Sequence, residues 1–329
     1  MGTLADLGYG LITIVLGIAV SLGVYKLLDF LISLLPARAQ KRLRVWAFIT
    51  PAAALVVLVL LYPLVQTILL SFMNKDSSDW VGFKNYVDLY TSPDFWSVLL
   101  NNFLWIAFVP AATVGIGLLT AALGNNVGPR RERVFKSAIF LPMSISFVSA
   151  ATIWKFMYVF TAPGRPVVGL LNAIAEAFGQ KPQPWLDIDQ NRLNSFLLMI
   201  IIVWLQAGFS MVILSAAIKA VPEETIEAAR IDGANTRQVF FRIVMPQIRT
   251  AVMSVFVTVV ILVMKIFDIV WTMTGGQFNT NVLGVDFYQQ YFLNFNTGGA
   301  AAVVTILCLL VAPLMWIQIR NVRHQESLR

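Results

Sequence analysis

The sequence predicts an all-α, polytopic membrane protein with about seven transmembrane helices. Three features predict this class: the composition, the number of long apolar segments and the distribution of basic residues. Hydrophobic residues make up 58% of the 329 residues and charged residues only 12%, whereas about a quarter of the residues are charged in soluble domains. So apolar a chain needs lipid to solvate part of its surface. A soluble enzyme, a DNA-binding domain and a disordered linker are therefore excluded.

Seven segments are apolar enough to cross a bilayer as helices, which takes about 20 residues. They are residues 8–33, 47–72, 98–123, 138–160, 195–217, 251–274 and 300–319. The first segment carries Lys26 and Asp29, so we expect its span to end near Tyr25 and to continue as an amphipathic turn. A signal peptide is the alternative, because Ala37-Arg38-Ala39 resembles a cleavage site. The long apolar segment, with no basic residue at its start, favours a retained helix.

Basic residues lie in alternate loops and predict the orientation. Sixteen of the 24 Lys and Arg residues follow the first, third, fifth and seventh segments, whereas the other loops hold five. The sixteen are Arg38, Lys41, Arg42, Arg44, Arg130, Arg131, Arg133, Lys136, Lys219, Arg230, Arg237, Arg242, Arg249, Arg320, Arg323 and Arg329, and the five are Lys75, Lys84, Arg165, Lys181 and Arg192. Loops rich in Lys and Arg face the cytoplasm. We therefore expect the N-terminus outside and the C-terminus in the cytoplasm.

Cysteine and histidine are too scarce for most metal or cofactor sites. Cys308 lies in an apolar segment and His324 in the basic tail, and each is the only residue of its type. We therefore expect no internal disulfide, no zinc, haem or iron–sulfur site and no His-dependent triad. The net charge of +7 follows from the basic loops, so nucleic acid is not an expected partner.

Two of the loops predicted to lie outside have the composition of ordered structure. Residues 73–97 combine four Asp with aromatic residues and are expected to contain a short surface helix. Residues 161–194 include a stretch of helical period from Val167 to Phe178. Both loops have the length to receive an external partner, and the alternative is that they only connect spans.

The segment 218–250 differs from a simple connector. Pro222 is followed by Glu223 and Glu224. This order predicts a helix start, because Pro suits the first turn and acids are favourable at the positive end of the helix dipole. We expect the helix to stop at a turn near Gly233.

Small residues leave this helix with an almost bare surface, because Ala228 and Ala229 precede Gly233. A second helix is expected from Thr236 to Val244, leading to Pro246 and the sixth span. A helix–turn–helix shelf between two spans predicts a docking surface for another protein.

The residues of this shelf have a regular spacing. Glu227-Ala228-Ala229 is followed after three residues by Gly233, after nine more by Ile243 and after one more by Met245-Pro246. This pattern resembles the EAA motif of binding-protein-dependent ABC transporter permeases. Met245 is the single departure, because that family usually has Leu there, and the swap conserves volume.

The resemblance extends over roughly residues 47–325. The residues that resemble the carbohydrate-uptake branch are Asn101-Asn102, Trp154-Lys155-Phe156, Phe267-Asp268-Ile269-Val270 and Met273-Thr274-Gly275-Gly276. A helix before six core spans is similar to the F-type permease of the maltose group. Pro222-Glu223-Glu224-Thr225-Ile226 and Lys265-Ile266-Phe267-Asp268 are most like the alpha-glucoside permease of the Agl type. Permeases for trehalose, glucosylglycerol, maltodextrin and glycerol phosphate are the alternatives.

The resemblance implies a division of labour between subunits. In that family the EAA shelf is the coupling helix, which sits in a groove of an ATP-binding subunit. The resemblance therefore implies contacts with that subunit for Glu227, Ala228, Ala229, Gly233 and Pro246. The chain has no Gly-Lys pair and hence no P-loop. We therefore expect it to be non-catalytic and to hold no cofactor, with ATP and magnesium in the partner ATPase.

The implied partners are a second permease, two ATP-binding cassette subunits, an extracytoplasmic solute-binding protein and a carbohydrate. The implied location is the bacterial cytoplasmic (inner) membrane, as a multi-pass protein. Residues 1–46 would form an N-terminal helix and connector, and residues 47–329 the importer domain with the cytoplasmic loop 218–250.

Polar residues at membrane depth are candidates for the translocation path, because ionisable groups there are costly and usually functional. Gln206 lies about halfway along the fifth span. Lys265 and Asp268 are three residues apart and are expected on one helix face. Both are expected either to bond sugar hydroxyls or to form a structural ion pair.

Aromatic residues close to these positions are further candidates. Trp204, Phe209 and Trp271 would offer faces to a sugar ring, with packing as the alternative. Ser210 is a weaker candidate, because serine at membrane depth commonly bonds its own helix backbone.

Two other seven-helix classes fit less well. A retinal protein needs a lysine in its last helix, and the seventh segment has none. An ion-coupled secondary transporter would use Lys265 and Asp268 as a coupling pair, but it predicts matching halves that the sequence lacks and leaves the EAA spacing unexplained.

Overall fold

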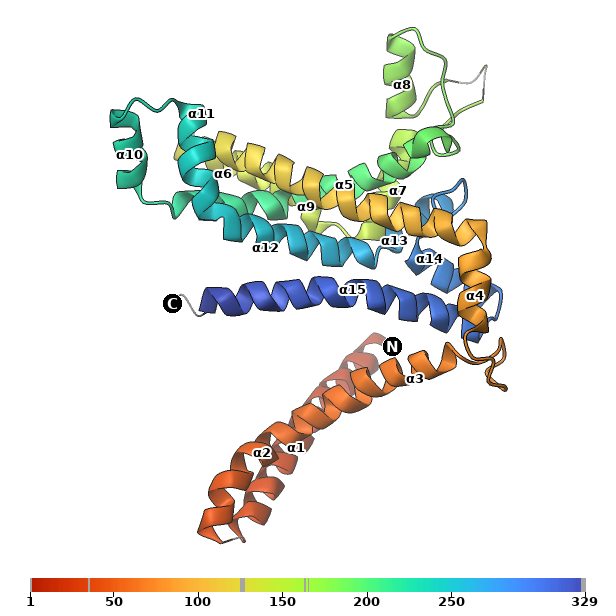
Figure 1. Cartoon of the computed structure of the whole chain (residues 1–329), viewed down its shortest axis with the longest axis vertical. Helices are drawn as coiled ribbons and strands as arrows, with labels where there is room; N and C mark the ends of the chain where they lie inside the picture. The colour runs from red at the N-terminus through yellow and green to blue at the C-terminus, as the bar shows by residue number, and fades with distance from the viewer. Residues whose placement is uncertain (1, 35, 125–127, 163, 165, 327–329) are drawn as a thin grey trace. The chain divides into compact units, whose positions relative to one another are not determined.

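The structure is a computed structural model that describes residues 2–34, 36–124, 128–162, 164 and 166–326. By contacts the chain divides into two compact units, Met1–Leu69 and Leu70–Arg329. Helices make up nearly all of both units (Figure 1). Among the described residues the only strand-like pairing is an isolated bridge between Met73 and Trp80. The predicted all-α class is confirmed.

The first unit consists of long apolar helices. They are α1 (Gly2–Ser33), α2 (Ala37–Val56), the π-helical segment η1 (Val57–Leu61) and α3 (Tyr62–Leu70). α1 and α2 pack side by side. The rings of Tyr25 and Phe48 stack between them, with centroids 5.8 Å apart. The polar end of the first segment is part of α1, which continues to Ser33. Asp29 in this end forms an ion pair with Arg44 of α2 at 2.9 Å. Most of the apolar side chains are exposed, as lipid-facing residues are.

The second unit holds the remaining elements. They are α4 (Lys84–Thr91), α5 (Pro93–Gly124), α6 (Pro129–Phe140), η2 (Leu141–Ser144), α7 (Phe147–Tyr158), α8 (Leu170–Ala177), η3 (Gln190–Arg192), α9 (Leu193–Lys219), α10 (Glu223–Ile231), α11 (Thr236–Gln238), η4 (Val239–Val244), α12 (Met245–Met264), α13 (Asp268–Thr274), α14 (Leu283–Tyr288), η5 (Gln289–Leu293) and α15 (Thr297–Glu326).

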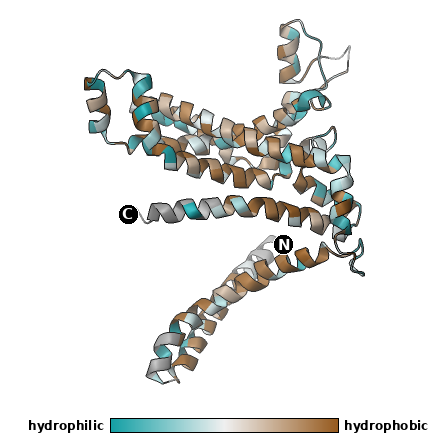
Figure 2. Ribbon diagram, viewed as in Figure 1, coloured by the Kyte–Doolittle hydropathy of each residue, from teal (hydrophilic) through white to brown (hydrophobic). Residues whose placement is uncertain are grey.

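Helix α9 is the centre of this unit. It packs against α5, α6 and α12, and the core cluster includes the fully buried side chains of Trp105, Leu198 and Met211. Figure 2 shows hydrophobic residues along the bodies of α5, α12 and α15, whereas hydrophilic residues gather around α10, α11 and the loops at the opposite end. The apolar bodies match spanning helices, with polar structure at both ends.

Among the described residues, six helices have the length and apolarity to cross a membrane, and a bent pair raises the number to seven. The pair is Arg130–Ser144 with Phe147–Tyr158, which meet at 102°. The span expected over 138–160 is therefore not one straight helix. Pro142 lies in the 3-10 segment η2 and Ser146 is extended, with its hydroxyl capping the N–H of Ser149. The number of spans agrees with the prediction, whereas the continuity of the fourth does not.

The two ordered loops expected from the sequence are present. Residues 73–97 contain α4, and the stretch from Val167 to Phe178 contains α8. Arg165 and Arg329, which contribute to the predicted orientation, lie outside the described residues.

Candidate functional site

Helix α10 forms an exposed shelf at the end of the second unit where α9 and α11 meet their loops (Figure 1). Pro222 is its N-cap, and Glu223 and Glu224 occupy its first turn. Negative charge is favourable there because the unpaired N–H groups make that end positive. The helix start predicted from these residues is confirmed.

The same helix ends in a Schellman motif. The N–H of Gly233 donates to the carbonyl oxygen of Arg230 over 3.0 Å, and the N–H of Ala234 donates to that of Ala229 over 3.0 Å. Gly233 has φ +84°, a left-handed conformation that glycine adopts without steric cost. The predicted turn is confirmed, and its conformation favours glycine.

One face of α10 points away from the rest of the unit. Glu224, Glu227, Ala228 and Ile231 are exposed, and Ile231 is 85% exposed. Among the described residues none of the ion pairs includes Glu227. Its carboxylate therefore has no basic partner within the chain's described part.

The other face of α10 is anchored. Ile226 and Ala229 pack on a small apolar cluster of Val221, Val239, Val244 and Ile248. Of the residues expected at the docking contact, Glu227, Ala228 and Gly233 are exposed, whereas Ala229 is half-buried. Pro246, the remaining one, is exposed in the first turn of α12.

The second half of the shelf is a continuous helix into the sixth span. Asn235 and Gln238 form a capping box in which each side chain accepts the other's backbone N–H, at 2.8 and 2.9 Å. α11, the π-helical η4 and α12 then follow without a break. The helix expected over 236–244 is confirmed, and it links the shelf directly to the membrane.

An ion cluster that the sequence analysis missed fixes α6 to α9 beside this shelf. Glu132 pairs with Lys136 and with Lys219, both at 2.5 Å, and Lys136 also bonds the hydroxyl of Ser215. The Glu132 side chain is only 16% exposed. The available clue was that Glu132 is the one acid in the basic segment 124–137, four residues before Lys136.

Four of the seven candidates for the translocation path lie along α9. Gln206 is 7% exposed. Trp204 packs edge-on against Trp154, with centroids 5.8 Å apart, and Phe209 packs on the core.

Ser210 is enclosed where α9 crosses α5. It is completely buried, and a Cβ built on Gly117 would lie 2.1 Å from its Oγ. Small residues allow membrane helices to approach this closely. Its place is therefore at a helix contact, with no surface for a ligand in this conformation.

Lys265 and Asp268 do not share a helix face, so that expectation is wrong. α12 ends at Met264, Lys265 is non-helical with ψ 24°, and α13 begins after Phe267, whose φ is −139°. No ion pair joins the two side chains among the described residues. The reason is tertiary: Ile266, Ile269 and Val270 are buried in the core. No Gly or Pro marks the break in the sequence.

The break is followed by a row of aromatic side chains. The ring of Trp271 stacks with that of Phe267, with centroids 6.0 Å apart, and its centroid is 4.6 Å from that of Tyr288. The centroids of Tyr288 and Phe292 are 4.8 Å apart. Phe292 is 51% exposed. Of these residues only Trp271 was predicted as a path candidate. Phe267 lies in the same predicted span without having been a candidate, and Tyr288 and Phe292 come from a loop with no spanning pattern.

At the opposite end from the shelf, buried amides hold the segment 279–283. Asn101 donates to the carbonyl oxygens of Asn279 and Asn281 over 2.6 and 2.8 Å. Asn102 accepts from the N–H of Leu283 over 2.8 Å. The Asn101-Asn102 pair therefore fixes a loop, a role that its position at the start of a span did not reveal.

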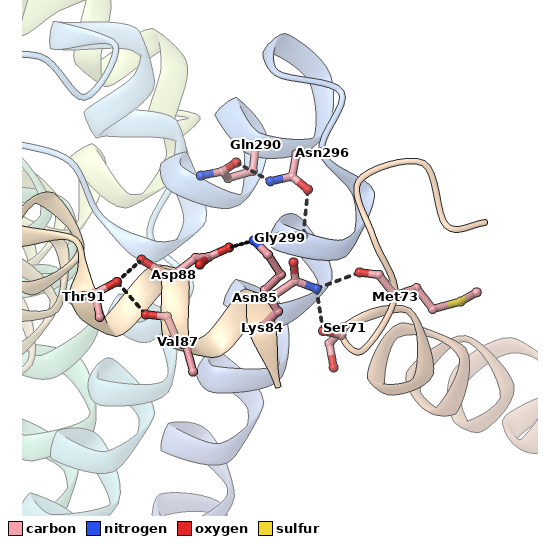
Figure 3. A network of polar contacts seen from close by, with 10 residues as sticks. All are labelled: Ser71, Met73, Lys84, Asn85, Val87, Asp88, Thr91, Gln290, Asn296 and Gly299. Atoms are coloured by element: carbon pink, nitrogen blue, oxygen red, sulfur yellow. Dashed lines mark hydrogen bonds and ion pairs between the residues drawn. The ribbon is translucent and has the colours of Figure 1, made fainter. Parts of the chain in front are cut away.

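A second polar network at this end has one part at α4 and another at the start of α15 (Figure 3). Asn85 donates to the carbonyl oxygens of Ser71 and Met73 over 2.8 and 2.7 Å. Asn296 accepts from the N–H of Gly299 over 3.0 Å and donates to Gln290 over 3.2 Å. These bonds give the loops a defined structure.

A polar cavity of about 340 Å³ adjoins this network. Its lining includes three carboxylates, those of Asp88, Asp94 and Asp286. Burial raises the pKa of Asp286 to about 6, and the negative charge of Asp94 adds to the shift. Asp88 pairs with Lys84 at 2.8 Å.

Similar proteins of known type match most of the chain. The alpha-glucoside transport system permease protein AglF of Rhizobium meliloti is 43% identical over 291 residues, covering 88% of this chain and 85% of its own length. The osmoprotective compounds uptake permease protein GgtC of Synechocystis is 44% identical over 282 residues, covering 86% and 100%.

The fold has a counterpart among solved structures. A chain in the crystal structure of a bacterial alginate ABC transporter, in complex with an alginate pentasaccharide-bound periplasmic protein, has a TM-score of 0.72. That chain is 18% identical, and the match covers 85% of this chain and 93% of the other. The likeness supports the fold.

Residues 113–324 match the family described as binding-protein-dependent transport system inner membrane component. This region contains the shelf, the ion cluster and the break after α12. Its apolar helices agree with a multi-pass protein of the inner membrane. Because the match covers more than half of the chain and two relatives agree over most of their length, the chain belongs to the family of binding-protein-dependent transport system inner membrane components.

Proposed function

We propose that this permease moves an alpha-glucoside, or a related di- or oligosaccharide, into the cell as part of an ATP-driven importer. The complex would contain a second permease, two ATP-binding cassette subunits and an extracytoplasmic solute-binding protein. The division into an accessory N-terminal segment over residues 1–46 and an importer domain over 47–329 is part of this proposal. So is the orientation with α10 in the cytoplasm, which rests on the distribution of Lys and Arg.

The observation that carries the proposal is the free outer face of α10. Glu227 is exposed and has no ion-pair partner among the described residues. A carboxylate on a nearly bare helix surface suits a basic residue on a docked ATPase subunit. Since Ile226 and Ala229 anchor the opposite face, a displacement of α10 would move the adjoining spans with it.

The mechanism that follows is alternating access. The binding protein delivers the sugar at the end formed by α4, α14 and the loop 275–299, and ATP binding to the partners shifts α10. This shift passes to α9 through Val221 and to α12 through η4. ATP and magnesium act in the partner subunits, and the permease contributes binding and movement.

The substrate path is proposed along α9 and the break after α12. Non-helical backbone at membrane depth is tolerated where protein buries it or where it lines a cavity, and interrupted helices often form transport sites. We assign Gln206, Lys265 and Asp268 to hydrogen bonds with sugar hydroxyls. Trp271 would contribute a ring face.

The choice of sugar rests on the relatives. AglF is named for alpha-glucosides and GgtC for osmoprotective compounds, at nearly equal identity. An alpha-glucoside is therefore the first substrate to test, with other small glucosides after it. The ion-coupled alternative loses support because Lys265 and Asp268 do not share a helix face.

The test is purification of the tagged chain with its native neighbours, as wild type and as Glu227→Lys. We expect a P-loop ATPase and a second permease to co-purify with the wild type, and the variant to lose the ATPase. Glu176→Lys, on the exposed helix α8, is the matched control and should retain it. Purification of the wild type without an ATPase would refute the proposal.

Substrate assignment needs a second measurement. The complex, reconstituted with its binding protein, should hydrolyse ATP faster when an alpha-glucoside is added than when an unrelated amino acid is added. Stimulation by another class of sugar would support the importer function and contradict the assignment of an alpha-glucoside as its substrate.

A further inference from the structure

An apolar groove runs between α5 and η4, beneath the inner face of α10. Its volume is about 540 Å³. It is lined by Gly115, Leu118, Leu119, Ala122, Ile218, Ile226, Arg230, Thr236, Arg237, Val239, Phe240, Phe241, Val244 and Met245. Eleven of these fourteen residues lack a polar side chain.

The groove lies on the surface of the spanning helices. Its α5 wall belongs to the span Pro93–Gly124 and its η4 wall to the span Thr236–Met264. Leu119 and Phe241, one on each wall, are 60% and 66% exposed. Large apolar side chains at this depth lie where lipid chains are available.

Positive charge lies at one end of the groove. Arg237 is in the first turn of its span and Arg230 is on α10, just outside the span. Among the described residues no acid lines the groove, and neither arginine forms an ion pair. Two guanidinium groups without a counter-charge form a site for a phosphate or another anion.

We propose that this groove binds one anionic phospholipid, with an acyl chain along α5 and η4 and the phosphate between Arg230 and Arg237. A phospholipid combines a long apolar chain with a negative group at one end, which is the arrangement of the lining. Basic pockets between spanning helices are suited to anionic head groups. The assignment is independent of the transported substrate.

A soluble ATPase subunit is the less suitable occupant. The face of α10 that suits a soluble partner carries Glu227 and Ala228, whereas the groove uses Ile226 and Arg230, which are one turn apart on another face. A soluble subunit would also have to cover the exposed apolar walls at the depth of the spans.

The bound lipid would support the shelf. Ile226 contributes both to the groove and to the cluster that anchors α10. Removal of the lipid would leave that side of Ile226 without contacts and give α10 more freedom. We therefore expect coupling to depend on anionic lipid.

The test measures phospholipid retained by the purified complex, using native mass spectrometry after exchange into phosphatidylglycerol or phosphatidylcholine. Arg237→Gln should lower retention of phosphatidylglycerol about tenfold, the effect of losing one charge-assisted contact. Gly115→Leu should also lower it, because nothing lies within 4 Å of a Cβ at Gly115 and the new side chain would extend into the groove.

Arg242→Gln is the matched control. Arg242 is exposed on the same helical segment but does not line the groove, so its loss should leave retention unchanged. Equal loss in Arg237→Gln and Arg242→Gln would overturn the proposal, and so would equal retention of phosphatidylglycerol and phosphatidylcholine. Unchanged thermal stability of each variant excludes a folding defect.

A photo-crosslinking amino acid at Leu119 identifies the occupant directly. An adduct with the mass of phosphatidylglycerol supports the proposal, whereas an adduct with an ATPase or permease subunit overturns it. Neither lipid retention nor crosslinking requires transport. A negative result would therefore contradict the lipid site without contradicting the proposed importer function.

Discussion

Arg192 at the start of α9 donates a hydrogen bond from Nη1 to the Oδ1 of Asn101 on α5 over 2.6 Å. The same guanidinium reaches the carbonyl oxygen of Asn279 at 3.1 Å and the hydroxyl of Ser97 at 3.1 Å. Arg192 has φ +56°, which costs a non-glycine residue roughly 1–2 kcal/mol. The bonds of its side chain offset this strain and fix the loop that follows α13.

Replacing Asn101 by Ala should destabilise this end of the permease. Asn101 is completely buried, and its loss leaves two carbonyl oxygens and the Arg192 guanidinium with fewer partners, at about 1–3 kcal/mol for each buried group left unpaired. Proteolysis of the complex should then cleave the segment 279–283 faster. Asn294→Ala, an exposed amide nearby, should leave the cleavage rate unchanged.

Replacing Gly233 should impair coupling through backbone strain alone. Its φ is +84° and nothing lies within 4 Å of an added Cβ. Gly233→Val should cost roughly 1–2 kcal/mol and reduce ATPase binding, whereas Gly233→Asn should be better tolerated because Asn adopts this conformation more readily. Equal effects of the two substitutions on co-purified ATPase would contradict this explanation.

Replacing Glu132 by Gln should separate α6 from α9. The neutral amide leaves Lys136 and Lys219 facing each other without a shared carboxylate, so we expect the unfolding temperature of the complex to fall. Thermal unfolding of the complex measures it. Asp88→Asn removes a pair whose side chains are 66% and 59% exposed, and should change stability by less than about 0.5 kcal/mol.

Transport should depend on Gln206 and Trp271 but not on Ser210. Gln206→Leu keeps the size of the side chain and removes the amide that could bond a sugar hydroxyl, and Trp271→Ala removes a ring face, so both should lower sugar uptake. Ser210→Ala should leave uptake unchanged, because Ser210 lies enclosed against Gly117. Uptake unaffected by both of the first two changes would move the path away from α9 and α13.

Asp286 should make stability depend on pH. Burial and Asp94 raise its pKa from 3.8 to about 6, so the folded chain keeps a proton that the unfolded chain releases. Stability should therefore fall as the pH rises through this window and then level off. Asp286→Asn should remove this slope from the thermal unfolding of the complex and stabilise it at neutral pH. The same slope in the variant would assign it to another group.

The shelf was predictable because its determinants are local. Pro222 with two following acids marks the start of α10, and Gly233 marks its end, whatever packs around them. The break after α12 was not predictable in this way. Residues 265–267 contain no Gly or Pro, and helical periodicity runs through them.

Single candidate residues show the same division. Trp271 was found from its depth, but its neighbours Phe267 and Tyr288 come together only when α13 and α14 fold against each other. Ser210 was a weaker candidate by sequence, and the crossing of α5 over α9 encloses it. The depth of a residue in the membrane can be estimated from its position within a span, whereas its contacts with side chains of another helix cannot.

The sequence by itself determined the membrane class, the number of spans and the shelf with Glu227 on it, because hydropathy and turn chemistry are properties of short segments. Only the tertiary structure decided the bent fourth span, the break between Lys265 and Asp268, the ion cluster at Glu132 and the groove beneath α10. These features depend on which side chains pack around α9, and that packing involves residues far apart in the sequence.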